Sequence, residues 1–446
     1  MGKLFGTDGI RGRANRYPMT PELALKVGQA VAKHFCVGIN TASIVIGKDT
    51  RLSCDMIESA LIAGICAAGG DVISGGVLPT PAIAYLTAHS DAAAGIVISA
   101  SHNPYYDNGI KIFDQDGYKL SDDVENQLED LINKGLAAAD EPEPGCILPE
   151  LEAGSKYVQF LTNLMPSGFN LSGMKIAIDC SNGATCQVAP ELFSQLGAQL
   201  ISLAVAPDGR NINDNCGSQH PENLIKAVLS EKADVGLAFD GDGDRLIAVD
   251  ESGNVATGDQ ILAICANVMK KGGLLKNNTV VSTVMSNLGF RIALKKLGMD
   301  LVLADVGDRY VLAQMQQSGA VIGGEDSGHM IFLDHHTSGD GILTALKLIE
   351  AMQKEAKPLS ELARIMEVFP QKLVNVEVKS KPEIETVPEI VAAIAAAEDE
   401  LGQQGRVLVR YSGTQALCRV MVEAPTDAET TRHCSRIADI VKKSIG

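Results

Sequence analysis

Three times along the chain, a short apolar run leads into a glycine-rich or polar turn and then into a stretch with helical periodicity. These runs cover residues 43–47, 175–179 and 279–283. Strands that alternate with helices predict βαβ units, and therefore mostly parallel sheets covered on both faces. Because the runs start roughly a hundred residues or more apart, a typical domain size, they predict three similar α/β domains with mixed or parallel sheets.

The pattern changes after Pro358. Residues 373–378 and 406–410 alternate apolar with polar side chains, an alanine-rich helical stretch lies between them, and residues 427–444 have the periodicity of a closing helix. Alternation with period two is typical of strands that face solvent on one side. The C-terminal part is therefore predicted to be a smaller α+β domain with an antiparallel sheet.

A chain of 446 residues is too long for a single hydrophobic core. The segment 137–154 is rich in Ala, Pro, Glu and Gly, and its Pro-Glu-Pro-Gly run should break regular structure, so we place the first boundary there. The predicted domains are residues 1–152, 153–252, 253–366 and 367–446.

Charge and composition exclude several classes of protein. The formal net charge of −17 would repel both a nucleic-acid backbone and an anionic membrane surface, so neither is an expected partner. The start of the sequence lacks the order of a signal peptide, and glycines divide the most apolar window, residues 60–78, into a helix and a strand. Ten cysteines without a C-x-x-C pair favour free thiols over disulfides or a zinc site. We expect a cytoplasmic protein.

A buried strand over residues 95–98 is followed by the serine loop, residues 99–104, which reads Ser-Ala-Ser-His-Asn-Pro. This order presents a hydroxyl group at the end of a strand, where α/β folds place their ligands. Ser101 is a candidate nucleophile or phosphoryl carrier, and His102 and Lys111 are candidate acids or bases. If this loop is considered alone, a polar turn capped by serine explains it better than a catalytic site does.

A second loop, the metal loop, alternates aspartate with glycine directly after an apolar strand, at Asp240, Asp242 and Asp244. Carboxylates at this density repel each other unless a cation binds, and all-oxygen ligands indicate Mg²⁺ or Ca²⁺. With Glu251, the aspartates match part of an EF-hand calcium loop, but Arg245 stands where that loop needs glycine and the flanks read as strands. Open coordination positions suit a catalytic Mg²⁺ that also holds a phosphoryl oxygen.

Two further loops combine glycine with polar residues. The sugar loop, residues 324–329, contains Glu325, Ser327 and His329, which can hydrogen-bond hydroxyl groups, although a surface turn explains it equally well. The phosphate loop, residues 410–414, places two hydroxyl groups and a glycine after an apolar strand. Such a backbone nest next to Arg410 could bind a phosphate, or it could be a plain hairpin turn.

In this order, the four loops resemble the phosphoserine, metal, sugar and phosphate loops of the α-D-phosphohexomutase superfamily. Residues 5–12 are similar to the opening segment of that superfamily, and the resemblance covers essentially the whole chain. It implies four domains around a central cleft, each contributing one loop. One departure concerns the phosphate loop, which usually continues with Glu-Pro but here continues with Gln415 and Ala416. The anion-binding residues before that point are present, so we expect phosphate binding to persist.

Residues 211–218 and 306–311 are similar to the bacterial phosphoglucosamine mutase branch of the superfamily. This resemblance implies an isomerase that interconverts glucosamine 6-phosphate and glucosamine 1-phosphate for UDP-N-acetylglucosamine and cell-wall precursor synthesis. A phosphomannomutase or phosphoglucomutase is the alternative within the superfamily. A non-catalytic sugar-phosphate-binding protein on the same fold is the alternative outside enzymes. The resemblance is compatible with a homodimer.

The resemblance also implies roles for single residues. Ser101 would carry the phosphoryl group, with a hexose 1,6-bisphosphate as activator, and Lys111 or His102 would act on the sugar hydroxyl, for which the pKa of Lys111 must be lowered. Arg245 and His329 are the further catalytic candidates. One Mg²⁺ per subunit is expected on Ser101, Asp240, Asp242 and Asp244. The expected substrate-binding residues are Arg11, Glu325, Ser327, Arg410, Ser412, Gly413 and Thr414.

Overall fold

The computed structural model describes residues 4–6, 8–36, 42–134, 143–412 and 416–446. The chain forms two compact units, which are described separately below. The larger unit contains residues up to 284 together with 300–364, and the smaller unit contains residues 285–299 together with 365–446. Part of the predicted Pro-Glu-Pro-Gly breaker lies outside the described residues. No helix among the residues described is long and apolar enough to cross a membrane.

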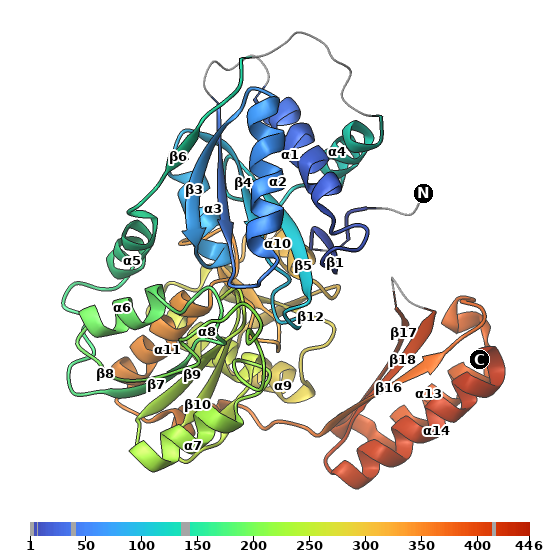
Figure 1. The fold of residues 1–446 in the computed structure, drawn as a ribbon. Helices are drawn as coiled ribbons and strands as arrows, with labels where there is room; N and C mark the ends of the chain where they lie inside the picture. The colour runs from blue at the N-terminus through green and yellow to red at the C-terminus, as the bar shows by residue number, and fades with distance from the viewer. Residues whose placement is uncertain (1–3, 7, 37–41, 135–142, 413–415) are drawn as a thin grey trace. The chain divides into compact units, whose positions relative to one another are not determined.

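The first sheet of the larger unit is mixed and has six strands (Figure 1). Strands β4, β2, β3 and β6 pair in parallel, whereas β5 pairs antiparallel with both of its neighbours, β4 and β1. In spatial order the strands are β1 (Ile10–Arg13), β5 (Asp107–Asp114), β4 (Ala92–Ile98), β2 (Ser43–Lys48), β3 (Asp71–Val77) and β6 (Ile147–Pro149). The helices are α1 (Pro21–Phe35), α2 (Cys54–Ala67), α3 (Thr80–Ala88) and α4 (Asp122–Lys134).

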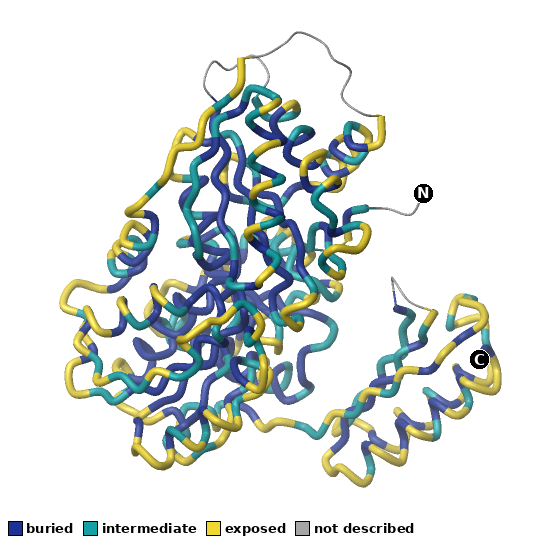
Figure 2. The backbone as a smooth tube through the Cα atoms, in the orientation of Figure 1, coloured by how far each residue is buried: buried dark blue, intermediate teal, exposed yellow. Residues whose placement is uncertain are grey.

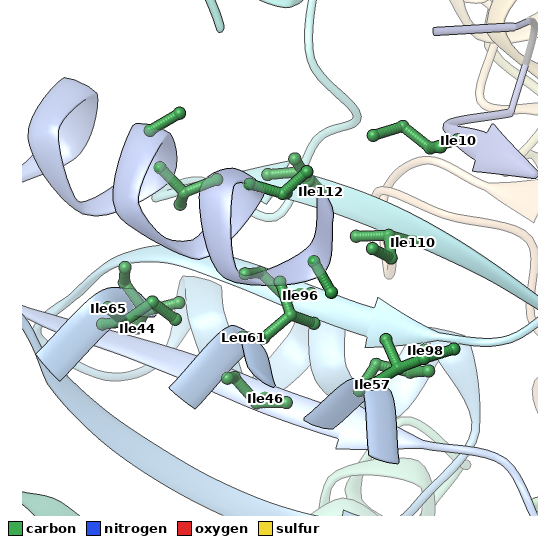
Figure 3. Packing of buried hydrophobic residues seen from close by; sticks show 14 of the residues in the cluster. Ile10, Ile44, Ile46, Ile57, Leu61, Ile65, Ile96, Ile98, Ile110 and Ile112 are labelled. Carbon is green, nitrogen blue, oxygen red and sulfur yellow. The ribbon is translucent and has the colours of Figure 1, made fainter. Parts of the chain in front are cut away.

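Helices α1 and α2 pack closely together over this sheet. The Thr20 hydroxyl caps α1 by accepting a hydrogen bond from the backbone N–H of Leu23 at 3.3 Å. A Cβ on Gly28 would lie 2.3 Å from the carbonyl oxygen of Leu61, so only glycine allows this approach. Isoleucines of β2 and β4 and the apolar face of α2 form the core of this layer (Figure 3).

The second and third sheets are also mixed. The second contains β11 (Val255–Ala256), β10 (Leu246–Asp250), β9 (Val235–Phe239), β7 (Lys175–Asp179) and β8 (Gln199–Leu203), with α5 (Ala153–Asn163), α6 (Val188–Gln195) and α7 (Glu222–Glu231). The third contains β13 (Asp300–Ala304), β12 (Thr279–Thr283), β14 (Ile322–Gly324) and β15 (Met330–Phe332), with α8 (Gly258–Lys271), α10 (Asp308–Ser318), α11 (Gly341–Glu355) and α12 (Leu359–Leu362). Strands β7, β9, β10, β12, β14 and β15 are largely buried, whereas the edge strands β8 and β13 are partly exposed (Figure 2).

The smaller unit has a three-stranded antiparallel sheet in the order β16 (Gln371–Glu377), β18 (Leu417–Glu423) and β17 (Arg406–Tyr411). Its helices are α9 (Leu288–Lys296), α13 (Pro388–Leu401) and α14 (Asp427–Ile445). Buried side chains of α13 and α14 form a separate core with one face of this sheet. The predicted fold class is confirmed: three mixed α/β sheets are followed by a smaller antiparallel domain.

Candidate active site

The serine loop and the metal loop meet in the larger unit. The serine loop follows β4, which ends at Ile98, and the metal loop follows β9, which ends at Phe239. The Ser101 hydroxyl donates a hydrogen bond to Oδ2 of Asp240 at 2.6 Å, and both residues are buried. The serine loop and the metal loop therefore form one site, although they are far apart along the chain.

Ser101 has an unusual backbone conformation. Its φ angle is +52°, in the left-handed region that residues other than glycine rarely occupy. The Ser101 N–H donates to the Ser99 hydroxyl at 2.9 Å. The Ser101 carbonyl accepts from Nη2 of Arg51 at 2.7 Å and from Nδ2 of Asn213 at 2.9 Å. Both peptide groups that flank the candidate phosphoryl carrier are thus held by side chains.

Asp240, Asp242 and Asp244 form a potential metal-binding group, since one oxygen atom from each lies within 4.8 Å of the others. All three are buried. Among the residues described, the Oδ1 atoms of Asp242 and Asp244 have no hydrogen-bond partner. Buried carboxylate oxygens without partners are costly, and a hard divalent cation is the partner that oxygen ligands suit. The residues present therefore fit the expected metal.

The pKa values of these carboxyl groups are shifted in opposite directions. Burial, followed by the repulsion of Asp244 and Asp242, raises the pKa of Asp240 well above its ordinary value. Burial also acts to raise the pKa of Asp242, but the Lys111 ammonium group outweighs it and lowers that pKa. Two carboxyl groups in one loop thus differ in charge preference, because Lys111 contacts Asp242 directly, whereas for Asp240 burial and the neighbouring carboxylates outweigh the attraction of Arg245.

The glycines between the aspartates have steric roles. A Cβ on Gly241 would lie 2.5 Å from the Ser101 carbonyl oxygen, so this glycine lets the metal loop pack against the serine loop. Gly243 has a φ angle of +73°, which favours glycine, and a Cβ there would lie 2.6 Å from the Thr185 side chain. The alternation of aspartate and glycine therefore reflects close packing as well as ligand spacing.

The ammonium group of Lys111 lies among three carboxylates. Its Nζ lies 2.7 Å from Asp242, 3.2 Å from Asp8 and 3.4 Å from Asp244. Burial would lower the pKa of Lys111, but these three carboxylates outweigh burial and raise it well above the ordinary lysine value. A role as base would require a lowered pKa, and the three carboxylates shift it in the opposite direction.

The pKa of His102 is shifted in the opposite direction to that of Lys111. Its Nδ1 lies 3.3 Å from the Ser101 hydroxyl oxygen. Burial, together with the positive charges of Arg245 and Arg11, lowers the pKa of His102 to about 4. The imidazole is therefore neutral near pH 7, and a neutral ring can accept a proton.

The sugar loop lies next to the metal loop. The backbones of His329 and Arg245 pair across an isolated antiparallel bridge, and the backbone N–H of Arg245 donates to Oδ1 of Asp240 at 3.2 Å. Burial opposes the charge on Arg245, but Asp244, Asp240 and Glu325 raise its pKa. Ser327 is exposed in the turn. The structure thus places Arg245 next to His329 and close to Glu325, with Ser327 exposed in the same turn.

Arg11 belongs to a charge network that sequence reasoning only partly found. Asp8 forms ion pairs with Arg11 and Lys119, and Lys119 also pairs with Asp308. Nε2 of His329 lies 3.6 Å from Asp308. Asp8 and Asp308 stand in the segments 5–12 and 306–311 that carried the family resemblance, but nothing in the sequence marked Lys119.

Other contacts of the two central loops were missed as well. Thr80 donates a hydrogen bond to Oδ2 of Asp242 through its hydroxyl. Asp49 and Arg51 lie under the serine loop, and Asn213 reaches it from the second sheet. One signal was available, because Asp49 and Arg51 directly follow strand β2, just as Ser99 and Ser101 follow β4.

The phosphate loop lies in the smaller unit, at the end of β17. Arg410 faces Arg419 directly across the antiparallel pair of β17 and β18, and both side chains are half-buried. Two arginines directly opposite each other concentrate positive charge at this end of the sheet. Ser412 is buried, and its carbonyl accepts a hydrogen bond from Nζ of Lys381 at 2.7 Å. Gly413, Thr414 and Gln415 lie outside the described residues.

Comparison with known proteins covers the whole chain. Four domain families match in order: Phosphoglucomutase/phosphomannomutase, alpha/beta/alpha domain I at residues 2–139, domain II at 155–253, domain III at 257–369, and the C-terminal domain at 373–440. A phosphoglucosamine mutase of Syntrophus aciditrophicus is 59% identical over 449 residues, and one of Syntrophobacter fumaroxidans is 57% identical over 450. Both alignments cover all of each chain.

Solved structures agree with this match. A phosphoglucomutase/phosphomannomutase family protein from Burkholderia thailandensis superposes with a TM-score of 0.81 at 25% identity, covering 99% of this chain and 97% of that one. An Aspergillus fumigatus N-acetylphosphoglucosamine mutase, solved in complex with GlcNAc-6P and magnesium, shares the fold, with a TM-score of 0.67 at 18% identity and coverage of 99% and 96%.

Fold, site and comparisons thus define a phosphohexomutase of the phosphoglucomutase/phosphomannomutase type. Such an enzyme is an isomerase that moves a phosphoryl group on a sugar. Within this class, the chain belongs to the phosphoglucosamine mutase family.

Proposed function

We propose that this enzyme interconverts glucosamine 6-phosphate and glucosamine 1-phosphate through a phosphorylated Ser101 and a bound 1,6-bisphosphate. The observation that carries the proposal is the hydrogen bond of Ser101 to Asp240 within a group of three buried aspartates. A hydroxyl group next to a cation-binding carboxylate cluster is an arrangement suited to accepting and donating a phosphoryl group. The family membership supplies the sugar.

The metal in this proposal is one Mg²⁺ per subunit, held by Asp240, Asp242, Asp244 and the phosphorylated Ser101. When bound, Mg²⁺ neutralises charge on the transferring phosphoryl group, which is a main source of catalysis in phosphoryl transfer. Arg245, whose charge is stabilised by Asp244 and Asp240, adds positive charge from the protein side. Together these groups are suited to offset the negative charge of a phosphosugar.

The chemical step requires a proton carrier. The bond between phosphorus and the Ser101 oxygen breaks, a bond from phosphorus to O1 of glucosamine 6-phosphate forms, and the O1 proton leaves. The reverse transfer, from O6 of the bisphosphate to Ser101, yields glucosamine 1-phosphate. We assign proton acceptance to His102, because its Nδ1 lies 3.3 Å from the Ser101 hydroxyl oxygen and its ring is neutral, whereas Lys111 is held as a cation among three carboxylates. Lys111 then acts by its charge.

Substrate contacts follow from the remaining loops. Glu325 and Ser327 hydrogen-bond the sugar hydroxyls, with His329 and Arg11 beside them. Arg410, Ser412, Gly413 and Thr414 hold the phosphate that does not react. The opposed pair Arg410 and Arg419 supports the second assignment, since a dianion relieves their repulsion. We also propose the domain boundaries after residues 152, 252 and 366, and a cytoplasmic location.

The direct test is a coupled assay with three substrates in parallel: the 6-phosphates of glucosamine, mannose and glucose. Each reaction contains Mg²⁺ and a trace of a hexose 1,6-bisphosphate, which phosphorylates Ser101 at the start. We expect the highest kcat/KM for glucosamine 6-phosphate. Faster turnover of mannose or glucose phosphate would assign the enzyme to the neighbouring mutase activities, and no turnover of any sugar would favour a binding protein.

A further inference from the structure

Beneath the serine loop lies a buried ion pair that none of the roles above uses. Nε of Arg51 donates to Oδ2 of Asp49 at 2.8 Å, and both side chains are fully buried. The two residues directly follow strand β2. A buried ion pair is costly to form, and replacing it with apolar side chains is often no worse for stability. Its presence therefore calls for a role other than stability.

The guanidinium group of Arg51 holds the carbonyl side of the loop. Nη2 donates to the carbonyl of Ser101 at 2.7 Å. Nη1 donates to the carbonyl of Pro104 and, at 3.1 Å, to that of Asp107. Arginine has five N–H donors in a rigid planar fork, so one side chain can hold three carbonyls and a carboxylate at once.

The carboxylate of Asp49 holds the backbone N–H of Ser101, through the hydroxyl of Ser99. The Ser101 N–H donates to the Ser99 hydroxyl at 2.9 Å, and that hydroxyl donates to Oδ2 of Asp49 at 2.6 Å. Oδ1 of Asp49 accepts from the Cys54 thiol at 3.1 Å, which fixes the carboxylate further. Both peptide groups flanking Ser101 are therefore connected to one ion pair, directly through Arg51 and through Ser99.

This connection explains how Ser101 keeps its conformation. A left-handed residue other than glycine persists only where its surroundings over-determine it, and such residues gather at functional sites. The φ angle of +52° coincides with the orientation in which the Ser101 hydroxyl reaches Asp240 at 2.6 Å. A loop that relaxed toward ordinary backbone angles would turn this hydroxyl away from the metal group.

We propose that Asp49 and Arg51 are the positioning residues for the phosphoryl-carrying serine. Neither touches the reacting atoms; they act by holding the peptide groups on either side of Ser101, with Ser99 as the link. The proposal rests on the proposed function, in which Ser101 accepts and donates the phosphoryl group. It predicts that weakening this network slows phosphoryl transfer without weakening substrate binding.

The test compares three variants of the full-length enzyme with the wild type. Arg51→Lys keeps the charge, but an ammonium group cannot span the three carbonyls and the carboxylate. Ser99→Ala keeps the ion pair and removes only the link to the Ser101 N–H. Ile57→Val, a buried change in the same core with no polar contact, is the control for lost stability.

Two quantities are measured in each variant: kcat and KM for glucosamine 6-phosphate, and the rate at which glucose 1,6-bisphosphate phosphorylates Ser101, followed by intact mass after timed quenching. We expect kcat and the phosphorylation rate to fall together, by about a hundredfold in Arg51→Lys and about tenfold in Ser99→Ala, because small displacements of a reacting group have effects of this size. KM should stay within about twofold, as for an interaction made only in the transition state. Ile57→Val should keep the wild-type rates.

The proposal is overturned if the folded variants keep the wild-type rates, if the loss lies in KM alone, or if Ile57→Val loses as much as Ser99→Ala. Should Arg51→Lys fail to fold, Ser99→Ala decides alone, since it leaves the ion pair in place. Failure of the proposed function gives a different result: the wild-type enzyme itself would then acquire no phosphoryl group on Ser101.

Discussion

The serine and metal loops of the larger unit differ in kind from the phosphate loop of the smaller unit. Around Ser101 and Asp242, charged groups are buried and fixed by side chains from several strands and loops. At the end of β17, Arg410 and Arg419 are half-buried and face each other across two strands. Under the proposed function, the first region would hold the reacting groups still, whereas the second would present positive charge to the phosphate that does not react.

This difference predicts how damage to each region should appear in kinetics. Loss of a group that acts in the transition state lowers kcat, whereas loss of a group that holds the substrate equally before and during reaction raises KM. Variants of the serine and metal loops should therefore lower kcat, and variants of the phosphate loop should raise KM.

The largest effect is expected for Asp242→Asn. This change removes a carboxylate from the potential metal group, and kcat should fall by about a thousandfold or more, even in added Mg²⁺. Tm should fall as well, since buried Lys111 loses its nearest carboxylate. The control is Asp179→Asn, a buried carboxylate at the end of the neighbouring strand β7, which should keep most activity. Near-normal turnover of Asp242→Asn would refute the metal-loop assignment.

Arg410→Ala should affect binding instead. Removing charge-assisted hydrogen bonds to a phosphate costs about 2 kcal/mol, so KM should rise by about thirtyfold with a much smaller change in kcat. Steady-state kinetics with glucosamine 6-phosphate measure both. The matched control is Arg432→Ala on α14, an exposed arginine of the same unit that pairs with Glu400. A loss confined to kcat would break the division between the two regions.

Gly241→Ala should give an intermediate loss in kcat. The new Cβ would lie 2.5 Å from the Ser101 carbonyl oxygen and 2.8 Å from Nδ2 of Asn213, so the two loops must move apart. We expect kcat to fall by about tenfold and KM to change little. In Gly272→Ala the added Cβ makes only ordinary contacts, and activity should be unchanged. Wild-type kcat in both variants would show that close packing of the loops is dispensable.

The smallest effect concerns pH. His336 is buried, and its Nε2 donates to the Pro81 carbonyl at 2.9 Å, while its Nδ1 accepts from the Ser338 N–H. Burial lowers the pKa of His336 to about 4. The unfolded chain therefore binds a proton first as pH falls below about 6.5, and the folded state loses stability between about pH 6.5 and 4.

In His336→Gln this contribution is absent, because glutamine does not titrate. The decrease in Tm between pH 7 and pH 4.5, measured by thermal unfolding, should be smaller in the variant than in the wild type. His220→Gln, at an exposed position, should follow the wild-type curve. Parallel curves for the wild type and His336→Gln would contradict the assignment.

Sequence patterns predicted those features that depend on residues close together in the chain. Alternation of strands and helices gave the fold class, and Asp240, Asp242 and Asp244 were visible as a group because they are neighbours in the chain. Patterns failed where the site depends on residues far apart. The pKa of Lys111 could not be predicted without Asp8, and Lys119 became relevant only through its contacts with Asp8 and Asp308.

The two regions also differ in this respect. Asp49 and Arg51 follow a buried strand, as the serine loop does, so the same rule applied to β2 would have marked them. Their task was nevertheless invisible, because nothing local shows that they reach the peptide groups around Ser101. Arg410 and Arg419 face each other because of the register between β17 and β18, and the sequence did not specify that register.

Transfer of a phosphoryl group through Ser101 is the central claim, and intact-mass measurement tests it most directly. The enzyme is incubated with Mg²⁺ and glucose 1,6-bisphosphate, freed of excess reagent, and then mixed with glucosamine 6-phosphate. We predict a gain of one phosphoryl group, its loss to the sugar on mixing, and no gain at all in Ser101→Ala. An active wild-type enzyme that never gains the group, or a Ser101→Ala variant that gains it, would contradict the account.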